Sequence, residues 1–182
     1  MRIREAGAWD RPRRPVVITG FMGAGKTTVA AALAERLGCT LIDLDRFVAE
    51  REGRTAQMII DEDGEPRFRE IESEALRDAL ETDAGIISLG GGTWTVERNR
   101  ELVAEHGGLT VWLDAPFELC WRRIESATHA RPLARDPAKA RALYDARRVL
   151  YAQAMLRLEV SEDKNIAAIA AEIADRLLPF TR

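Results

Sequence analysis

A lysine and a threonine that follow a glycine-rich turn are the residues of this sequence whose types and spacing most directly predict chemistry. Residues 20–27 read Gly-Phe-Met-Gly-Ala-Gly-Lys-Thr, so a glycine, four further residues and a second glycine precede Lys26 and Thr27. In such a loop the backbone N–H groups surround a phosphate, the lysine neutralises the β- and γ-phosphate oxygens, and the hydroxyl can ligate Mg²⁺. We therefore expect a nucleotide-binding loop. Its expected contacts are Gly23, Ala24, Gly25, Lys26, Thr27 and Thr28.

The segments on either side of this loop support a phosphate site. Val16–Thr19 is short, apolar and β-branched, as a strand buried on both faces would be, and helical spacing runs from Lys26 to a glycine stop at Gly38. The positive end of that helix would point at the anion. A glycine-rich turn without a ligand is the alternative, and the complete motif between a strand and a helix makes it the weaker one. The sequence has no Asn-Lys-x-Asp segment for guanine, which favours ATP.

Strand-like and helical segments alternate through the rest of the chain. Short apolar runs end near Asp43, before the glycines at 90–92 and before Asp114, while helical spacing covers Glu65–Leu80 and Ile166–Leu178. This alternation predicts an α/β fold with a central parallel sheet. The further expected strands are Leu41–Ile42, Ile86–Ser88 and Thr110–Leu113.

One stretch interrupts the alternation. Between Ser126 and Lys139 the periodicity fails, and Arg131 and Arg135 lie among prolines and small residues. An ordinary polar connection and a mobile lid both fit this composition, and we expect a lid over about residues 126–139.

Two aspartates close the second expected strand. Asp43 and Asp45 are separated by Leu44, and in an extended segment this alternation puts both carboxylates on one side, facing the nucleotide. Phosphoryl transfer needs a carboxylate to hold or accept the hydroxyl proton, which Asp45 could do, while Asp43 could support Mg²⁺ through water. Capping of the following helix is the alternative for both aspartates. Taken alone, these two residues favour neither interpretation over the other.

Further motifs follow in order along the chain. They are the segment around Arg69, three glycines at 90–92, Arg131-Pro132-Leu133 and Arg147. Together with the phosphate loop and the paired aspartates, this series resembles the shikimate kinases in order and spacing from about Pro15 to Leu178. The resemblance implies a three-layer P-loop kinase fold with flanking helices and a mobile lid. It also implies ATP-dependent phosphorylation of shikimate to shikimate 3-phosphate in aromatic amino acid (chorismate) biosynthesis, with Mg²⁺ as cofactor.

The resemblance assigns roles to individual residues. The implied catalytic residues are Asp45, Lys26 and Arg131, and the implied metal-supporting residues are Thr27 and Asp43. Shikimate would be bound by Asp45, Arg69, Gly90, Gly91, Gly92 and Arg147. Arg131, on the lid, would also contact ATP, and Lys164 would border the adenine.

The residue types agree with this assignment. Planar guanidinium groups suit a carboxylate, and an aspartate together with a glycine N–H suits ring hydroxyls. Arg69 and Arg147 lie on predicted helices, so ion pairs with neighbouring acids on a solvated face are the alternative for each taken singly. Three adjacent glycines at a strand end are better explained by close approach of the backbone to a ligand.

Three positions depart from the family pattern: Leu44 between the aspartates, Trp94 after the glycines, and Ala134 after Arg-Pro-Leu. None of them removes an expected ligand, although Trp94 could narrow the acceptor pocket and Ala134 could loosen the packing of the lid. A kinase resembling the gluconate kinases and a noncatalytic nucleotide-binding homologue are the competing functions. The glycine triplet with its two arginines opposes the first, and the intact catalytic residues oppose the second.

Composition bounds the remaining possibilities. The 182 residues suit one domain, expected over 15–182 after a disordered basic leader at 1–14, with acceptor-binding helices at about 46–81. The 27 Lys and Arg against 30 Asp and Glu give a net charge of -3, which provides no general attraction for nucleic acid or anionic membranes. Cys39 and Cys120 form no paired motif, as expected for reduced thiols in the cytoplasm. We expect a cytoplasmic monomer whose partners are ATP and shikimate.

Overall fold

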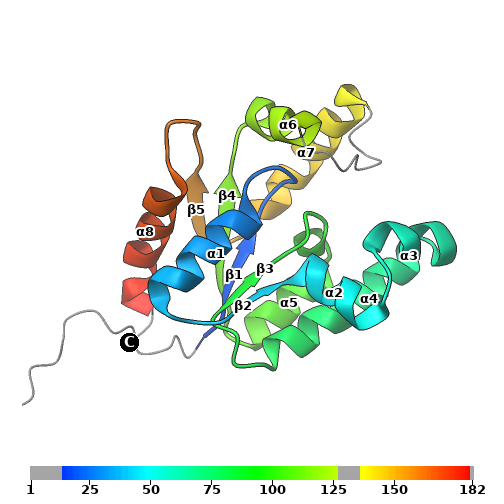
Figure 1. Cartoon of the computed structure of the whole chain (residues 1–182), viewed down its shortest axis with the longest axis horizontal. Helices are drawn as coiled ribbons and strands as arrows, with labels where there is room; N and C mark the ends of the chain where they lie inside the picture. Colours follow the sequence, from blue (N-terminus) through cyan, green and yellow to red (C-terminus); the bar gives the residue numbers. More distant parts are fainter. Residues whose placement is uncertain (1–13, 127–135, 181–182) are drawn as a thin grey trace, which may run out of the picture.

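A single parallel sheet organises the chain, and a computed structural model describes it over residues 14–126 and 136–180. Its strands lie in the order β2-β3-β1-β4-β5 (Figure 1). They are β1 (Val16–Thr19), β2 (Leu41–Asp43), β3 (Ile86–Ser88), β4 (Leu109–Asp114) and β5 (Leu156–Glu159). The strands that the sequence predicts are confirmed, and β5 is a strand that it did not predict.

The central position of β1 explains its composition. All four of its residues are buried, and Val17 pairs with Ile87 of β3 on one side and with Thr110 of β4 on the other. Because every strand is parallel, the segments that follow them emerge at the same edge of the sheet. The glycine-rich loop after β1, the aspartates after β2 and the three glycines after β3 are therefore brought to one edge.

Helices cover both faces of this sheet. On one face α1 (Lys26–Leu37) packs against α8 (Ile166–Leu177) (Figure 1). On the other face lies α7 (Pro137–Tyr151). Its Tyr151 contacts β4, because the ring centre of Tyr151 lies 6.4 Å from that of Trp112. Beyond the β2 edge lie α2 (Leu44–Glu52), α3 (Ala56–Asp63) and α4 (Glu65–Leu80). The remaining elements are η1 (Thr93–Thr95), α5 (Glu97–Glu105), α6 (Phe117–Ser126) and η3 (Leu178–Phe180).

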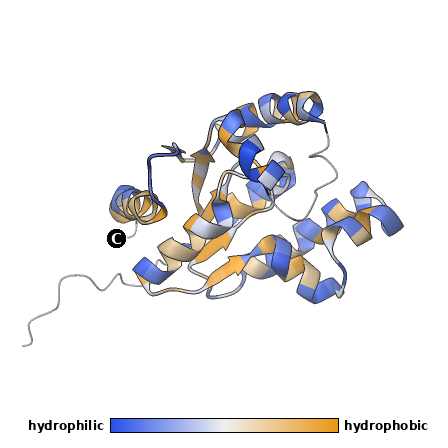
Figure 2. Cartoon of the chain, turned by 45° about the horizontal axis from the view of Figure 1, so that its top comes forward, coloured by the Kyte–Doolittle hydropathy of each residue, from blue (hydrophilic) through white to orange (hydrophobic). Residues whose placement is uncertain are grey.

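Hydrophobic residues concentrate on the strands and on the helix faces that cover them, while polar residues face outward (Figure 2). Gly38 adopts a left-handed conformation with φ 64° and ends α1, as the sequence predicts. Among the described residues, no helix is both long enough and apolar enough to cross a bilayer.

Both ends of the interruption expected at 126–139 are helical. Ser126 is still the last residue of α6, and α7 already begins at Pro137. Asp136 caps α7 by accepting hydrogen bonds from the N–H groups of Ala138 and Lys139, at 3.0 and 3.1 Å. An aspartate followed by proline starts a helix, because proline fits the first helical position where no N–H partner is needed. Residues 127–135, including Arg131 and Ala134, lie outside the described part of the chain.

Candidate active site

The glycine-rich loop turns tightly between β1 and α1. Gly23 has φ 78°, and a Cβ atom there would lie 2.6 Å from the carbonyl oxygen of Cys120, so both the backbone conformation and the space require glycine. Lys26 opens α1, and its Nζ donates to the carbonyl oxygen of Phe21 at 3.1 Å. The ammonium group is thereby held above the loop, where a bound phosphate would meet it.

The N-terminus of α1 is suited to an anion. Gly25 occupies the N-cap position and supplies no side-chain cap, and no acidic residue lies in the first turn. The first amides of α1 and the positive end of its dipole are therefore not capped by a side chain of the helix itself. Ala24 is buried, whereas Thr27 and Thr28 are exposed at the start of the helix.

Arg123 adds a cation to this loop. It lies on α6, and its Nη1 donates to the carbonyl oxygen of Gly23 at 3.1 Å. A Cβ atom on Gly25 would lie 3.5 Å from the same nitrogen. Arg123 is a site residue that sequence patterns do not indicate, because 100 residues separate it from Gly23 and no local motif links them.

The sequence predicts that Asp43 and Asp45 lie on one side of an extended segment, and the structure contradicts this. The strand ends at Asp43 and α2 begins at Leu44, so the helical rotation sends the two carboxylates in different directions. Asp43 caps α2 by accepting from the N–H of Arg46 at 3.2 Å, and its other oxygen accepts from Oγ1 of Thr27 at 2.6 Å. Capping and contact with the phosphate loop are thus combined in Asp43.

Asp45 instead faces the glycine triplet. A Cβ atom on Gly90 would lie 2.5 Å from Oδ1 of Asp45, 2.9 Å from Oε1 of Glu72 and 3.0 Å from Oγ1 of Thr93. Glycine at position 90 therefore leaves the space in which these three polar groups meet.

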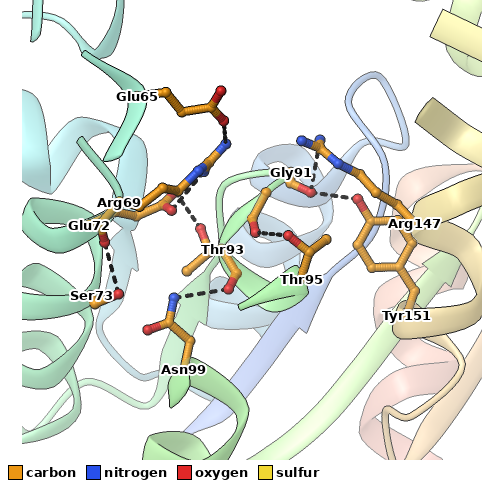
Figure 3. A network of polar contacts seen from close by, with 11 residues as sticks. Glu65, Arg69, Glu72, Ser73, Gly91, Thr93, Thr95, Asn99, Arg147 and Tyr151 are labelled. Carbon is orange, nitrogen blue, oxygen red and sulfur yellow. Dashed lines mark hydrogen bonds and ion pairs between the residues drawn. The ribbon is translucent and has the colours of Figure 1, made fainter. Parts of the chain in front are cut away.

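Glu72 holds the centre of a buried polar network (Figure 3). Its side chain is only 3% exposed; Oε2 accepts from Nη1 of Arg69 at 2.8 Å, and Oε1 accepts from Oγ1 of Thr93 at 2.6 Å. Burial raises the pKa of Glu72, and so does the negative charge of Asp45. The charge of Arg69 and the hydrogen bond from Thr93 lower this pKa, but the net direction is upward. The network fixes the position of Arg69 relative to the glycine triplet, residues 90–92, which we call the acceptor wall.

Arg69 reaches the same wall from α4. Its Nη2 also pairs with Glu65 at 3.0 Å, and a Cβ atom on Gly92 would lie 2.5 Å from its Nη1. The side chain is 25% exposed, and burial lowers its pKa while the neighbouring Glu72 and Glu65 raise it, with a net increase. The helical ion pairs considered in the sequence analysis exist, but they point the guanidinium at Gly92 instead of leaving it on a solvated face.

Arg147 approaches from the opposite side (Figure 3). Its Nη1 donates to the carbonyl oxygen of Gly91 at 3.3 Å, and the hydroxyl of Tyr151, one turn further along α7, donates to the same oxygen at 2.5 Å. A Cβ atom on Gly91 would lie 3.5 Å from the backbone nitrogen of Met22, so the glycine triplet also borders the phosphate loop. The glycine triplet, with a cation on each side, thus adjoins the phosphate-binding segment.

The triplet presents donors on its free side. Its three carbonyl oxygens all accept hydrogen bonds, from the N–H of Thr93, from Arg147 and Tyr151, and from Thr95. By contrast, the N–H groups of Gly91 and Gly92 donate to no acceptor within residues 14–126 and 136–180. Such a segment is suited to a ligand that carries oxygen acceptors.

Other predicted positions lie elsewhere. Lys164, in the loop between β5 and α8, donates to the carbonyl oxygen of Glu159 at 3.3 Å and pairs with Glu172 at 3.0 Å. Trp94 is buried in the core, where its Nε1 donates to the carbonyl oxygen of Leu150 at 3.0 Å. Its indole therefore ties η1 to the last turn of α7.

Two further residues of the site could have been found from spacing. Glu72 lies three residues after Arg69 and one after the buried Ile71, so the stripe that places Ile71 in the core also buries Glu72. Tyr151 lies four residues after Arg147, on the same face of α7.

The chain matches known proteins over most of its length. The family model of shikimate kinase matches residues 22–178. A shikimate kinase of Cereibacter sphaeroides is 41% identical over 155 residues, covering 84% of this chain and 77% of the relative, and one of Ruegeria pomeroyi is 40% identical, covering 86% and 85%.

Solved structures agree with these relatives. A shikimate kinase from Acinetobacter baumannii in complex with shikimate superposes with a TM-score of 0.84 at 32% identity, covering 92% of this chain and 94% of that one. A gluconokinase from Sinorhizobium meliloti, at 18% identity and a TM-score of 0.58, shares the fold alone. The family model thus covers the acidic turn, the glycine triplet and the phosphate loop from Met22 onward, and the chain belongs to the shikimate kinase family.

Proposed function

We propose that this chain transfers the γ-phosphoryl group of ATP to a hydroxyl of shikimate, giving shikimate 3-phosphate and ADP, a step of chorismate biosynthesis. The observation that carries the proposal is the convergence of Asp45, Arg69 and Arg147 on three successive glycines that border the phosphate loop. The carboxylate of Asp45 suits the hydroxyls of shikimate, and the guanidinium groups of Arg69 and Arg147 suit its carboxylate.

The roles follow from the positions of the groups. Lys26 and the amides of the loop bind the β- and γ-phosphates, and Arg123, beside Gly23, contributes a further positive charge to the nucleotide. Asp45 holds the acceptor hydroxyl and accepts its proton as the oxygen attacks the γ-phosphorus. Arg69 and Arg147 bind the carboxylate from opposite sides of the glycine triplet, and the N–H groups of Gly91 and Gly92 bind acceptor oxygens. Holding both reactants in line supplies most of the catalysis that such a transfer requires.

Mg²⁺ fits the oxygen donors beside the loop. The hydroxyl of Thr27 and the carboxylate of Asp43 are 2.6 Å apart, and both are hard ligands of the kind this cation prefers. Within the described residues no group of three or more His, Cys, Asp or Glu could hold a metal by itself, which agrees with an ion bound mainly through phosphates and water. When bound, the ion supplies positive charge at the β- and γ-oxygens. Thr27 would ligate it, and Asp43 would orient that hydroxyl and a water molecule.

Several assignments extend beyond the described contacts. We assign Arg131 to a lid at about residues 126–139, where it would place a cation on the transferring group, and Lys164 to the border of the adenine site. We also propose a single kinase domain over 15–182 after a basic leader, active as a cytoplasmic monomer.

A coupled assay of ADP release tests the function. Purified chain with Mg²⁺ and ATP should release ADP only when shikimate is present, and not with gluconate or without an acceptor. Release with gluconate alone would assign the chain to another acceptor, and ATP binding without any release would indicate a noncatalytic protein. Mass spectrometry of the product verifies one added phosphate.

A further inference from the structure

Tyr151 and Arg147 donate hydrogen bonds to the same atom of the acceptor wall, the carbonyl oxygen of Gly91 (Figure 3). The two donors differ in quality. The phenol hydroxyl donates at 2.5 Å, whereas the guanidinium donates at 3.3 Å, near the limit of a hydrogen bond. The carbonyl is therefore held mainly by Tyr151, and Arg147 contributes the weaker contact.

Tyr151 is built as a rigid donor. It is among the largest fully buried side chains of the protein, and its ring packs beside Trp112 at a centroid distance of 6.4 Å. Burial raises the pKa of its hydroxyl to about 12, while Arg147 lowers it, so the phenol keeps its proton under physiological conditions. A buried, protonated phenol in this position is a hydrogen-bond donor to the Gly91 carbonyl.

The orientation of the Gly91 carbonyl decides what the site presents. The described chain contains no cis peptide bond, so the N–H of Gly92 points opposite to the carbonyl of Gly91. Holding that carbonyl toward α7 directs the N–H of Gly92 to the side where Arg69 lies. The indole of Trp94 fastens the following turn to the same helix through Leu150, so the wall and the end of α7 form one unit.

We propose that Tyr151 is a positioning residue for the phosphoryl acceptor: its hydroxyl is sufficient to hold the Gly91 carbonyl, which leaves Arg147 available for the carboxylate of that acceptor. The inference rests on the proposed function, because it concerns the same acceptor. Without Tyr151, Arg147 would have to serve both the carbonyl and the carboxylate. Removal of the hydroxyl should then weaken acceptor binding and leave nucleotide binding intact.

The test compares Tyr151→Phe with Tyr144→Phe. Tyr144 lies two turns earlier on α7, is also buried, and its hydroxyl donates to the carbonyl oxygen of Ala115 at 2.9 Å. Each variant therefore loses one buried phenol-to-carbonyl hydrogen bond from the same helix, and only the first loses it at the glycine triplet. We expect Tyr151→Phe to raise the KM for shikimate about five- to tenfold, with the KM for ATP within about twofold of the parent, and Tyr144→Phe to leave both constants within about twofold.

Amide hydrogen exchange of the nucleotide-free protein gives a readout that does not depend on turnover. Residues 90–95 should exchange about tenfold faster in Tyr151→Phe than in the parent, and not in Tyr144→Phe. Unchanged exchange there, or a KM for shikimate that stays within about twofold, would overturn the role of Tyr151. If the parent chain released no ADP with shikimate, the proposed function would fail, and the exchange comparison would still decide whether Tyr151 holds the wall.

Discussion

Thr27 and Asp43 join the phosphate loop to a strand that is not adjacent to it. The hydroxyl of Thr27 donates to Oδ2 of Asp43 at 2.6 Å, although β3 separates β1 from β2 in the sheet. The other oxygen of Asp43 caps α2. One carboxylate therefore fixes the start of α1 relative to the start of α2, and hence the phosphate loop relative to Asp45.

This double role makes Asp43→Asn an informative change. Asparagine caps a helix as well as aspartate does, so the midpoint of thermal unfolding should stay within about 3 °C of the parent. The negative charge beside Thr27 is lost, and the Mg²⁺ concentration for half-maximal ADP release should rise about tenfold. A titration with Mg²⁺ at saturating ATP measures this, and an unchanged midpoint of that titration would remove Asp43 from the metal site.

Asp45→Asn tests the assignment of the proton acceptor. The amide keeps the shape of the carboxylate but cannot accept the hydroxyl proton, so kcat should fall about 100-fold or more. The KM for ATP should stay within about twofold, because Asp45 lies beside Gly90 at the acceptor side of the site. Asp61→Asn, at an exposed position of α3, is the matched control and should retain full turnover. Near-normal turnover of Asp45→Asn would mean that another group accepts the proton.

Arg147→Ala and Arg148→Ala form a matched pair on α7. Arg147 contacts Gly91 at the acceptor wall, whereas Arg148 pairs with Asp114 at 3.2 Å, away from it. Loss of a charged hydrogen bond to the acceptor should raise the KM for shikimate about 10- to 100-fold in the first variant, with little change in the KM for ATP. The second variant should leave both constants nearly unchanged. Equal increases in the two KM values of Arg147→Ala would argue against a carboxylate contact.

Glu72 predicts a dependence of stability on pH. Burial raises the pKa of its carboxyl group in the folded protein, so the folded state binds this proton more tightly than the unfolded chain does. The resulting stability is complete below the ordinary carboxyl value of 4.5 and is lost as the pH rises through the raised pKa. Glutamine carries no such proton. The free energy of unfolding of the parent minus that of Glu72→Gln should therefore decrease as the pH rises above 4.5.

Urea unfolding at a series of pH values measures that difference. The same substitution at Glu70, an exposed residue of α4, serves as the control. A difference between parent and Glu72→Gln that increases with pH would show that the attraction of Arg69 outweighs the cost of burying the charge.

The sequence carried more information about the elements than about their orientation. β1, the phosphate loop and α1 were predicted from buried β-branched residues, glycines and a helical stripe, because these patterns are local. The extended conformation expected through Asp45 was wrong, since Asp43 caps a helix that already begins at Leu44. The lid expected over about residues 126–139 overlaps the first residues of α7, because Asp136 and Pro137 form a helix start.

By itself, the sequence determined that a phosphate loop, an acidic turn, a glycine triplet and two arginines occur in order on an alternating chain. Only the tertiary structure decided how they meet. Arg123 lies beside Gly23, Glu72 holds Arg69 against Gly92, and Tyr151 holds the carbonyl of Gly91. The physical reason is that parallel pairing brings the ends of β1, β2 and β3 to one edge, while helices packed on both sides deliver their side chains there. The spacing of residues along the chain does not show which of them come into contact.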